Sequence, residues 1–338
     1  MAGMFILIPL IVPSANVMPS LYGPRGVTPQ AVRQGTMGSC YFHAAVAALA
    51  GSNPEMIKRL IRCNADSSYT VEFPDGKKET AYLKDIQFAR DSGYDLSDGL
   101  WVSVLFRAYA QRTLRSALLG AIDGSALTVR IKSYVREFAA SNDACLLAYD
   151  RAIRSVVDQN GIINADRLKA ALRRELPHTK LFKDIEDTLV GLLDSHGVFA
   201  GLEAKIRESG ELFGAYRAVG QGGLPQRVLE ALTSRKALTT FITSDRNGIL
   251  KLLSAAPGLP AVVGTPNKEL ALHSSSSDSD WFSPRHAYTV LGYDASTMTV
   301  TILNPWGDKP SPDGILGLSF ERFLGFFETA ITLSPSFP

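Results

Sequence analysis

The feature that most constrains the fold is residues 34–49, QGTMGSCYFHAAVAAL, where a polar, glycine-containing loop runs directly into an alanine-rich apolar segment. This apolar segment is predicted to be a buried helix, and Cys40 stands where the loop becomes the helix. The first N–H groups of a helix lack intrahelical partners and carry about +0.5 charge, which should favour a thiolate and lower the pKa of Cys40. The position therefore predicts a nucleophile, with a buried structural cysteine as the alternative.

The composition is that of an ordinary globular protein. Its 338 residues, 46% hydrophobic and 20% charged, suit one large or two medium domains. The 35 basic and 33 acidic residues are too evenly balanced for a dedicated nucleic-acid binder. The three cysteines, Cys40, Cys63 and Cys145, have no CxxC spacing, which argues against a disulfide framework and a cysteine zinc site. We expect a reducing compartment, no metal or cofactor, and core positions for Cys63 and Cys145.

The N-terminal apolar run, residues 5–12, is interrupted by Pro9 and is too short to span a bilayer. No Lys or Arg precedes Arg25, so the positively charged start of a signal peptide is missing. We expect this run to be a strand or arm packed on the body, with a cleaved signal as the alternative. No membrane span is expected.

Apolar spacing and turn residues predict the remaining elements. Helices are expected over residues 54–63, 100–110, 127–218 with several breaks, 225–234 and 247–256, a hairpin over 69–83, a strand over 260–265 and a solvated loop over 273–280. The segment around Gly161 imitates the middle of an EF-hand loop. Calcium is rejected there, because Val156 and Arg167 occupy the positions where such a site needs carboxylates.

Two β-patterned runs, residues 285–293 and 299–307, follow in the C-terminal third and should pair antiparallel. A turn centred on Ala295 would bring His286 opposite Asn304 to within one residue, with Cβ atoms about 5 Å apart. A register slip of one residue would separate the two side chains across the faces of the sheet. The pairing is therefore a geometric prediction.

A cysteine, a histidine and an asparagine in this chain order suit thiol protease chemistry. The imidazole of His286 would take the proton of Cys40, and the amide oxygen of Asn304 would fix the tautomer and orientation of the ring. Structural alternatives remain, because a lone histidine is more often structural and an Asn-Pro pair is usually a turn. His43 is expected to pack in the core, and Ser39 lacks the GxSxG surroundings of a serine nucleophile.

Five segments together resemble the calpain family of papain-like cysteine proteases. They are residues 34–42, 100–110, 286–290, 304–307 and 318–324, and the resemblance covers roughly residues 20–115 and 220–333. It implies an α+β, papain-like fold with a helical N-terminal half, an antiparallel β-rich C-terminal half and a helical insertion. The implied domains are residues 1–126 for the nucleophile, 127–219 for the insertion and 220–338 for the His/Asn half.

The resemblance also implies roles for single residues. Cys40 would be the nucleophile, His286 the general base and acid, and Asn304 the group that orients the ring. Gln34 would form the oxyanion hole with the Cys40 backbone N–H, since a side-chain amide six residues before the nucleophile can meet that N–H. Trp306 would shield the His-Asn pair. The substrate-binding residues would be Gly38, Ser39, Gly222, Gly223, Arg285 and Trp306.

The sequence departs from the family where animal calpains bind calcium. Residues 21–33 contain no Asp or Glu, and residues 308–312 replace an acidic, Trp-rich loop. We therefore expect a calcium-independent endopeptidase that cleaves proteins or peptides through a thioacyl intermediate, with self-processing as a further expectation. An acyltransferase or deamidase and a catalytically silent protein-binding module are the alternatives. A lone catalytic core suits a cytoplasmic protein or an effector delivered into another cell.

Overall fold

A computed structural model describes most of both expected halves. The described residues are 20–123, 170, 174, 212–242, 245–256, 258–266, 282–307, 311 and 313–334, with the side chains of 115–123 and 212–214 not included. The expected N-terminal arm, Cys145, most of the 127–218 helical region and the loop over 273–280 lie outside these residues. The three-domain division stays a prediction.

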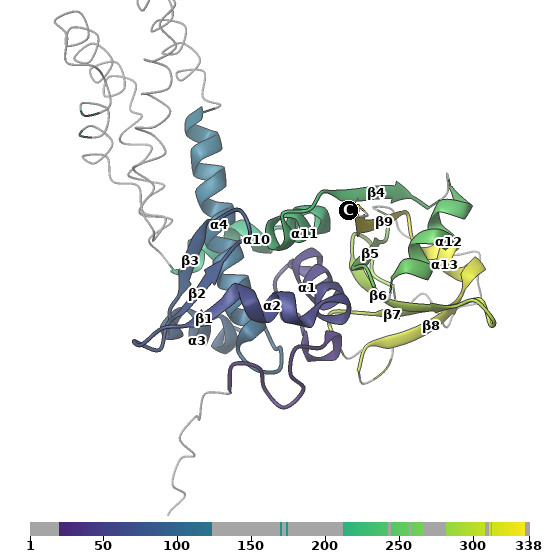
Figure 1. Cartoon of the computed structure of the whole chain (residues 1–338), viewed down its shortest axis with the longest axis horizontal. Coiled ribbons are helices and arrows are strands. Elements are labelled where there is room, and N and C mark those ends of the chain that lie inside the picture. The colour runs from purple at the N-terminus through teal and green to yellow at the C-terminus, as the bar shows by residue number, and fades with distance from the viewer. Residues whose placement is uncertain are drawn as a thin grey trace, which may run out of the picture.

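The described residues form an α+β protein with two antiparallel sheets, as the sequence predicted (Figure 1). The three-stranded sheet has the order β1-β2-β3, and the six-stranded sheet has the order β4-β9-β5-β6-β7-β8. The strands are β1 (Ile61–Cys63), β2 (Tyr69–Glu72), β3 (Lys78–Ala81), β4 (Ala237–Phe241), β5 (Ala261–Gly264), β6 (Ala287–Asp294), β7 (Thr299–Leu303), β8 (Ile315–Ser319) and β9 (Thr329–Leu333). The helices are η1 (Pro29–Ala31), α1 (Cys40–Ser52), α2 (Pro54–Leu60), α3 (Leu83–Asp91), α4 (Trp101–Asp123), α10 (Leu212–Gly220), α11 (Pro225–Thr233), α12 (Arg246–Ala255) and α13 (Phe320–Phe326).

Helix α1 lies between the two sheets and is the centre of the packing (Figure 1). Ten consecutive residues, from Tyr41 to Ala50, are buried, which confirms the helix predicted from the apolar run. Small alanine side chains let several neighbours approach at once: α1 packs on β5 and β6 from one half, and on η1, α2, α4 and α11. Cys40, the first residue of α1, therefore lies where the two halves meet.

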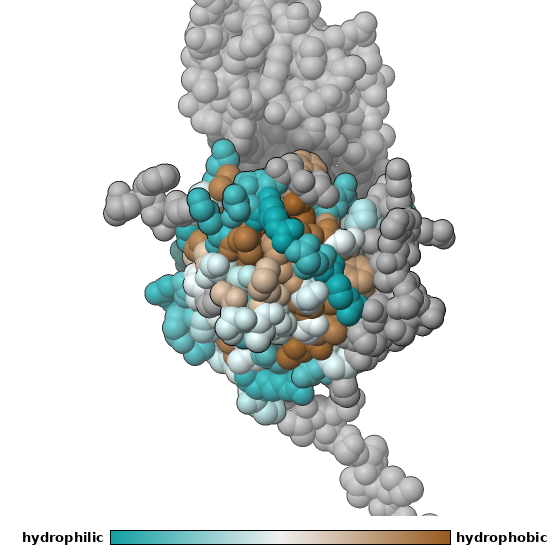
Figure 2. All heavy atoms as spheres, turned by 90° about the vertical axis from the view of Figure 1, so that its right-hand side faces the viewer, coloured by the Kyte–Doolittle hydropathy of each residue, from teal (hydrophilic) through white to brown (hydrophobic). Residues whose placement is uncertain are grey.

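The central strands β5 and β6 of the six-stranded sheet are buried on both faces. Side chains alternate along β6, so Ala287 and Thr289 face α1, while Tyr288 and Val290 enter a second core with α12 and α13. Figure 2 views the molecule from the side of this sheet and shows hydrophilic and hydrophobic residues mixed over that face. The sheet is thus held firmly against the helix that carries Cys40.

Secondary structure was predicted correctly where the sequence contains clear turn residues. The hairpin over residues 69–83 is confirmed as β2 and β3, and the helix expected over 54–63 ends at Leu60. Residues 61–63 instead form an edge strand, in which Ile61 pairs with Val71. Cys63, the last residue of this edge strand, is exposed, so the expectation of a core position for Cys63 is wrong. Strand β4 is half exposed and carries no clear alternation, and the sequence did not predict it.

No helix within the part of the chain that the structure describes is both long and apolar enough to cross a membrane. The same part holds no group of three or more His, Cys, Asp or Glu side chains arranged to hold a metal ion.

Candidate active site at the start of helix α1

Cys40 is a free, half-buried cysteine whose sulfur lies against the start of strand β6. The sulfur accepts a hydrogen bond from the backbone N–H of Ala287, the residue that follows His286. Burial raises the pKa of the Cys40 thiol above its ordinary value, and the N–H groups of Ala287, Tyr41 and Cys40 itself offset this only in part. The expected lowering of this pKa is therefore wrong, because loss of solvation outweighs the field of the helix terminus.

The second predicted part of the site is assembled as expected. The Nε2 atom of His286 lies 2.9 Å from the Oδ1 atom of Asn304, and the two residues are 5% and 1% exposed. The backbone N–H of Trp306 donates to the same Oδ1 atom at 3.1 Å, and only an oxygen can accept from that group. The amide is thus oriented with oxygen toward the ring, so Nε2 carries the proton and Nδ1 of the neutral ring keeps its lone pair.

The surroundings of His286 keep the ring neutral. Burial lowers the pKa of His286 from 6.5 to about 4, although the hydrogen bond with Asn304 acts in the opposite direction. The Trp306 ring lies against the imidazole with a centroid distance of 4.3 Å, and the Tyr288 ring meets it edge-on at 4.8 Å. A neutral imidazole with a free lone pair on Nδ1 can act as a general base.

The register that joins His286 to Asn304 differs from the expected one. Asp294 pairs with Thr299 across a four-residue turn, and this register alone would send the two side chains to opposite faces. A bulge between Val290 and Gly292 shifts the pairing by one residue. Asn304 then lies diagonally across from His286 on the same face, within reach of its side chain. The predicted direct opposition is wrong, but the predicted contact is present.

Gln34 joins the two halves of the site. Its backbone N–H donates to the Pro305 carbonyl at 2.7 Å, and the neighbouring guanidinium of Arg33 donates to the Gly307 carbonyl at 2.7 Å. The Gln34 side chain is buried, with Nε2 donating to the Met37 carbonyl at 2.6 Å and with no partner for Oε1. The amide therefore has a second N–H that this bond does not use.

The glycines predicted to contact substrate lie beside the start of α1. The N–H of Gly38 donates to the Gly220 carbonyl at 3.1 Å, and Gly38 forms an isolated parallel bridge with Gln221. Gly222 has a φ of +93°, and a Cβ atom on Gly223 would lie 2.5 Å from the Tyr41 ring, so both positions favour glycine. Gly38, Gly222 and Gly223 are all exposed.

Two other predicted substrate-binding residues have different surroundings. Ser39 is completely buried before the first turn of α1, which makes it part of the framework of the site and removes its side chain from the surface. Arg285 is exposed beside His286, with a left-handed φ of 53°.

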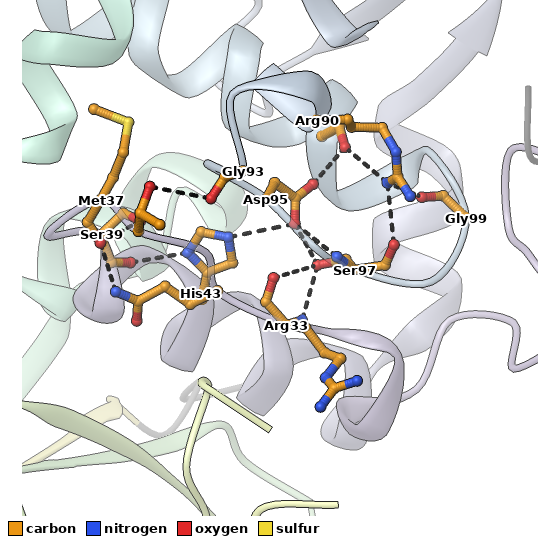
Figure 3. Close-up of polar contacts among 12 residues, drawn as sticks. Arg33, Met37, Ser39, His43, Arg90, Gly93, Asp95, Ser97 and Gly99 are labelled. Carbon is orange, nitrogen blue, oxygen red and sulfur yellow. Dashed lines mark hydrogen bonds and ion pairs between the residues drawn. The ribbon is translucent and has the colours of Figure 1, made fainter. Parts of the chain in front are cut away.

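Sequence analysis missed two polar links to α1. The Thr289 hydroxyl donates to the Ala44 carbonyl at 2.8 Å, and the buried ring of His43 lies between the Ser39 carbonyl and the Asp95 carboxylate (Figure 3). The expected burial of His43 is confirmed, but the ring also has polar partners. No local pattern could have revealed either link, because each partner lies on a distant element.

No protein-family model matches the sequence, and no curated protein matches it. Among solved structures, the chain is similar to PepW from Lactobacillus rhamnosis HN001, with 12% sequence identity and a TM-score of 0.34, covering 97% of this chain and 83% of that chain. A likeness this distant says nothing about the activity of this chain.

Proposed function

We propose that this protein is a cysteine endopeptidase of the calpain-like, papain-fold type, which hydrolyses peptide bonds through Cys40, His286 and Asn304. The observation that carries the proposal is the hydrogen bond from the Ala287 N–H to the Cys40 sulfur, beside a His286 ring whose tautomer Asn304 fixes. A half-buried thiol held by the residue that follows an oriented imidazole suits nucleophilic catalysis.

Acylation begins with proton transfer from the Cys40 thiol to Nδ1 of His286. The sulfur attacks the carbonyl carbon of the scissile peptide, forming a carbon–sulfur bond and a tetrahedral oxyanion. The backbone N–H of Cys40 and the unused side-chain N–H of Gln34 are the donors for this oxyanion, and one such donor is typically worth about 3 kcal/mol of transition-state stabilisation. The intermediate collapses, the carbon–nitrogen bond breaks, and Nδ1 returns its proton to the leaving amine.

Deacylation repeats the same steps with water. Nδ1 of His286 takes a proton from a water molecule, which attacks the thioester formed on Cys40. Collapse of the second tetrahedral intermediate releases the carboxylic acid and returns the proton to the sulfur. Throughout, the positive charge that develops on the ring is stabilised by Asn304, whose Oδ1 accepts from Nε2.

The glycines beside α1 favour an extended polypeptide as substrate. Gly38, Gly222 and Gly223 expose backbone without side chains next to Cys40, so the backbone of a second chain can approach and form main-chain hydrogen bonds. Recognition of this kind reads the peptide backbone, which supports protein or peptide substrates and includes cleavage of the protein's own chain.

Hydrogen bonds between the halves support activity without calcium. Gln34 and Arg33 both bind the segment that follows Asn304, and Thr289 binds α1 directly. These links hold the nucleophile, base and oxyanion donors in one arrangement, which is the task that calcium performs in a calcium-switched protease.

The test is mass spectrometry of an unfolded casein-like substrate incubated with the full chain, with and without a calcium chelator and with an added primary amine. We expect hydrolysed peptides in both conditions, none with Cys40→Ala, and normal cleavage with Cys63→Ala, the matched change at an exposed cysteine. Amine incorporated into side chains, or deamidated side chains, without cleavage of the main chain would point to acyl transfer or deamidation. Cleavage by Cys40→Ala would overturn the mechanism.

A further inference from the structure

His43 is held between two hydrogen-bond acceptors inside the protein (Figure 3). Its Nδ1 atom lies 3.0 Å from the Ser39 carbonyl oxygen, and its Nε2 atom lies 3.6 Å from Oδ1 of Asp95. Both His43 and Asp95 are 0% exposed. A carbonyl oxygen cannot donate, so Nδ1 must carry the proton that joins the ring to Ser39, while Nε2 faces the Asp95 carboxylate.

The Ser39 carbonyl belongs to the same peptide unit as the Cys40 N–H. A trans peptide is planar, so the direction of the carbonyl fixes the opposite direction of the N–H. This carbonyl accepts from the backbone N–H groups of Phe42 and His43 at 3.0 and 3.1 Å, as well as from the His43 ring. Hydrogen bonds to this carbonyl also polarise the peptide and strengthen its N–H as a donor.

Asp95 connects this ring to the second oxyanion donor. Its backbone forms an isolated antiparallel bridge with Gln34, flanked by hydrogen bonds from Gly35 to Tyr94 at 3.2 Å and from Leu96 to Arg33 at 2.9 Å. Its side chain accepts from the hydroxyl groups of Ser97 and Ser103 and from the backbone N–H of Ser97. Asp95 therefore contacts the Gln34 segment directly and is linked to the Ser39–Cys40 peptide through the His43 ring.

We propose that the buried His43–Asp95 pair is the positioning element of the oxyanion hole, setting the direction of the Cys40 N–H through the Ser39 carbonyl and holding Gln34 through the Asp95 backbone. This inference deepens the proposed function and rests on it for the catalytic consequence. His43 and Asp95 are positioning residues, because they act through other groups and do not touch the reacting atoms.

The groups around the pair enclose it on several sides. The Phe42 and Phe106 rings pack against His43 with centroid distances of 5.3 and 5.2 Å and exclude water. Burial alone would raise the pKa of Asp95, but the contact with His43 and the two serine hydroxyls hold it below its ordinary value.

Charged groups also lie near the pair. Arg90 reaches the same cluster through the Ser97 and Gly99 carbonyls, each at 3.0 Å. Asp85 is paired with Arg107. The negative charges of Asp85 and Asp95 both act to raise the pKa of Tyr216, so both carboxylates lie near its hydroxyl group.

The first experiment observes the Cys40 N–H directly, without any substrate. Selective ¹⁵N-cysteine labelling of a chain with three cysteines gives three amide signals, and Cys40→Ser assigns the one of interest. We expect the Cys40 signal to shift in His43→Leu and Asp95→Asn while the Cys63 signal stays in place. Asp85→Asn, the same change at another buried, ion-paired aspartate, should leave the Cys40 signal unchanged.

The second experiment measures peptide hydrolysis by the same variants. His43→Leu and Asp95→Asn should lower kcat by about 10- to 100-fold, as expected for a misaligned oxyanion donor, with KM changed less than about threefold. His43→Asn places an amide N–H where Nδ1 stands and should recover part of the loss. Alkylation of Cys40 by iodoacetamide forms no oxyanion, so its rate should change much less than kcat.

The outcomes separate this inference from the proposed function. A Cys40 amide signal that coincides with wild type in His43→Leu, or kcat and alkylation falling in parallel, would overturn the positioning role. If the signal shifts while the wild-type chain cleaves no peptide, the proposed endopeptidase fails and the structural coupling stands. If His43→Leu does not fold, Asp95→Asn and His43→Asn decide the result by the same two measurements.

Discussion

The Thr289 hydroxyl on β6 donates a 2.8 Å hydrogen bond to the Ala44 carbonyl, one helical turn into α1 from Cys40. Both groups are fully buried, and the bond ties the strand that follows His286 to the helix that Cys40 begins. We therefore expect the relative position of thiol and imidazole to depend on a threonine outside the proposed catalytic set.

Replacing Thr289 with valine keeps the shape of the side chain and removes the hydroxyl. We expect a loss of about 1 kcal/mol in the free energy of unfolding and a lower kcat, because β6 can then move relative to α1. Thr332→Val is the matched control, since Thr332 donates a similar 2.9 Å bond to the Pro260 carbonyl away from α1. Chemical denaturation and steady-state kinetics measure both effects; equal kcat values for the two variants would count against the link.

Asn304→Ala should lower kcat by about 10²–10⁴-fold, because the ring of His286 loses the group that fixes its tautomer. The Trp306 N–H would lose its acceptor as well. Asn304→Asp keeps an oxygen for both donors and adds a negative charge, which should raise the pKa of His286 and move the acid limb of kcat/KM to higher pH. Unchanged pH profiles and rates in both variants would contradict the assigned role.

The pKa of His286, lowered by burial from 6.5 to about 4, predicts how the protein responds to acid. Between these values the unfolded chain binds a proton that the folded chain does not, so stability rises with pH, by at most about 1.4 kcal/mol per unit. This contribution is lost as pH falls from 6.5 to 4. The acid limb of kcat/KM should have an apparent pKa of about 4.

Denaturation at several pH values and a pH–rate profile check this expectation. His286→Gln cannot titrate and should lose the corresponding slope in stability. An acid limb near 6.5, the ordinary value for histidine, would show that the ring is solvated in the working protein.

The raised pKa of Cys40 predicts a thiol that is protonated at rest. Alkylation by iodoacetamide should therefore increase with pH through an ionisation above the ordinary value for cysteine. A preformed thiolate–imidazolium pair would instead give a rate plateau that begins at acid pH. Peptide mapping separates Cys40 from the exposed Cys63, which reports on reagent reactivity in the same sample.

Sequence reasoning found the polar groups whose chemistry is visible locally. Cys40 was recognisable because a polar loop meets an apolar helix there, and His286 and Asn304 because each lies at the end of a β-patterned run. The register between them was predicted incorrectly, since the bulge after Val290 depends on tertiary packing. The contact was still predicted correctly. The turn lies further along the chain than expected, the bulge shifts the pairing by one residue, and together these two differences leave Asn304 on the same face as His286.

Features set by distant partners could not be predicted. The direction of the Cys40 pKa shift depends on how deeply β6 covers the sulfur, which no local pattern reveals. His43 was expected to be packing only, because its partner Asp95 lies on another segment. The exposure of Cys63 follows from the edge position of β1, and that strand could not be distinguished from the end of a helix in so short an apolar run.

The complete burial of α1 from Tyr41 to Ala50 limits how the molecule can be regulated. Separating the halves would expose apolar side chains of β5, β7 and β9 that share a core with α1, such as Val262, Leu303 and Ile331, to water, at about 1.5–3 kcal/mol each. The binding free energy of a small effector would not offset the cost of opening the halves about a hinge. We therefore expect inhibitors and physiological regulators to act by blocking access to the Cys40 thiol, while the two halves stay packed on α1.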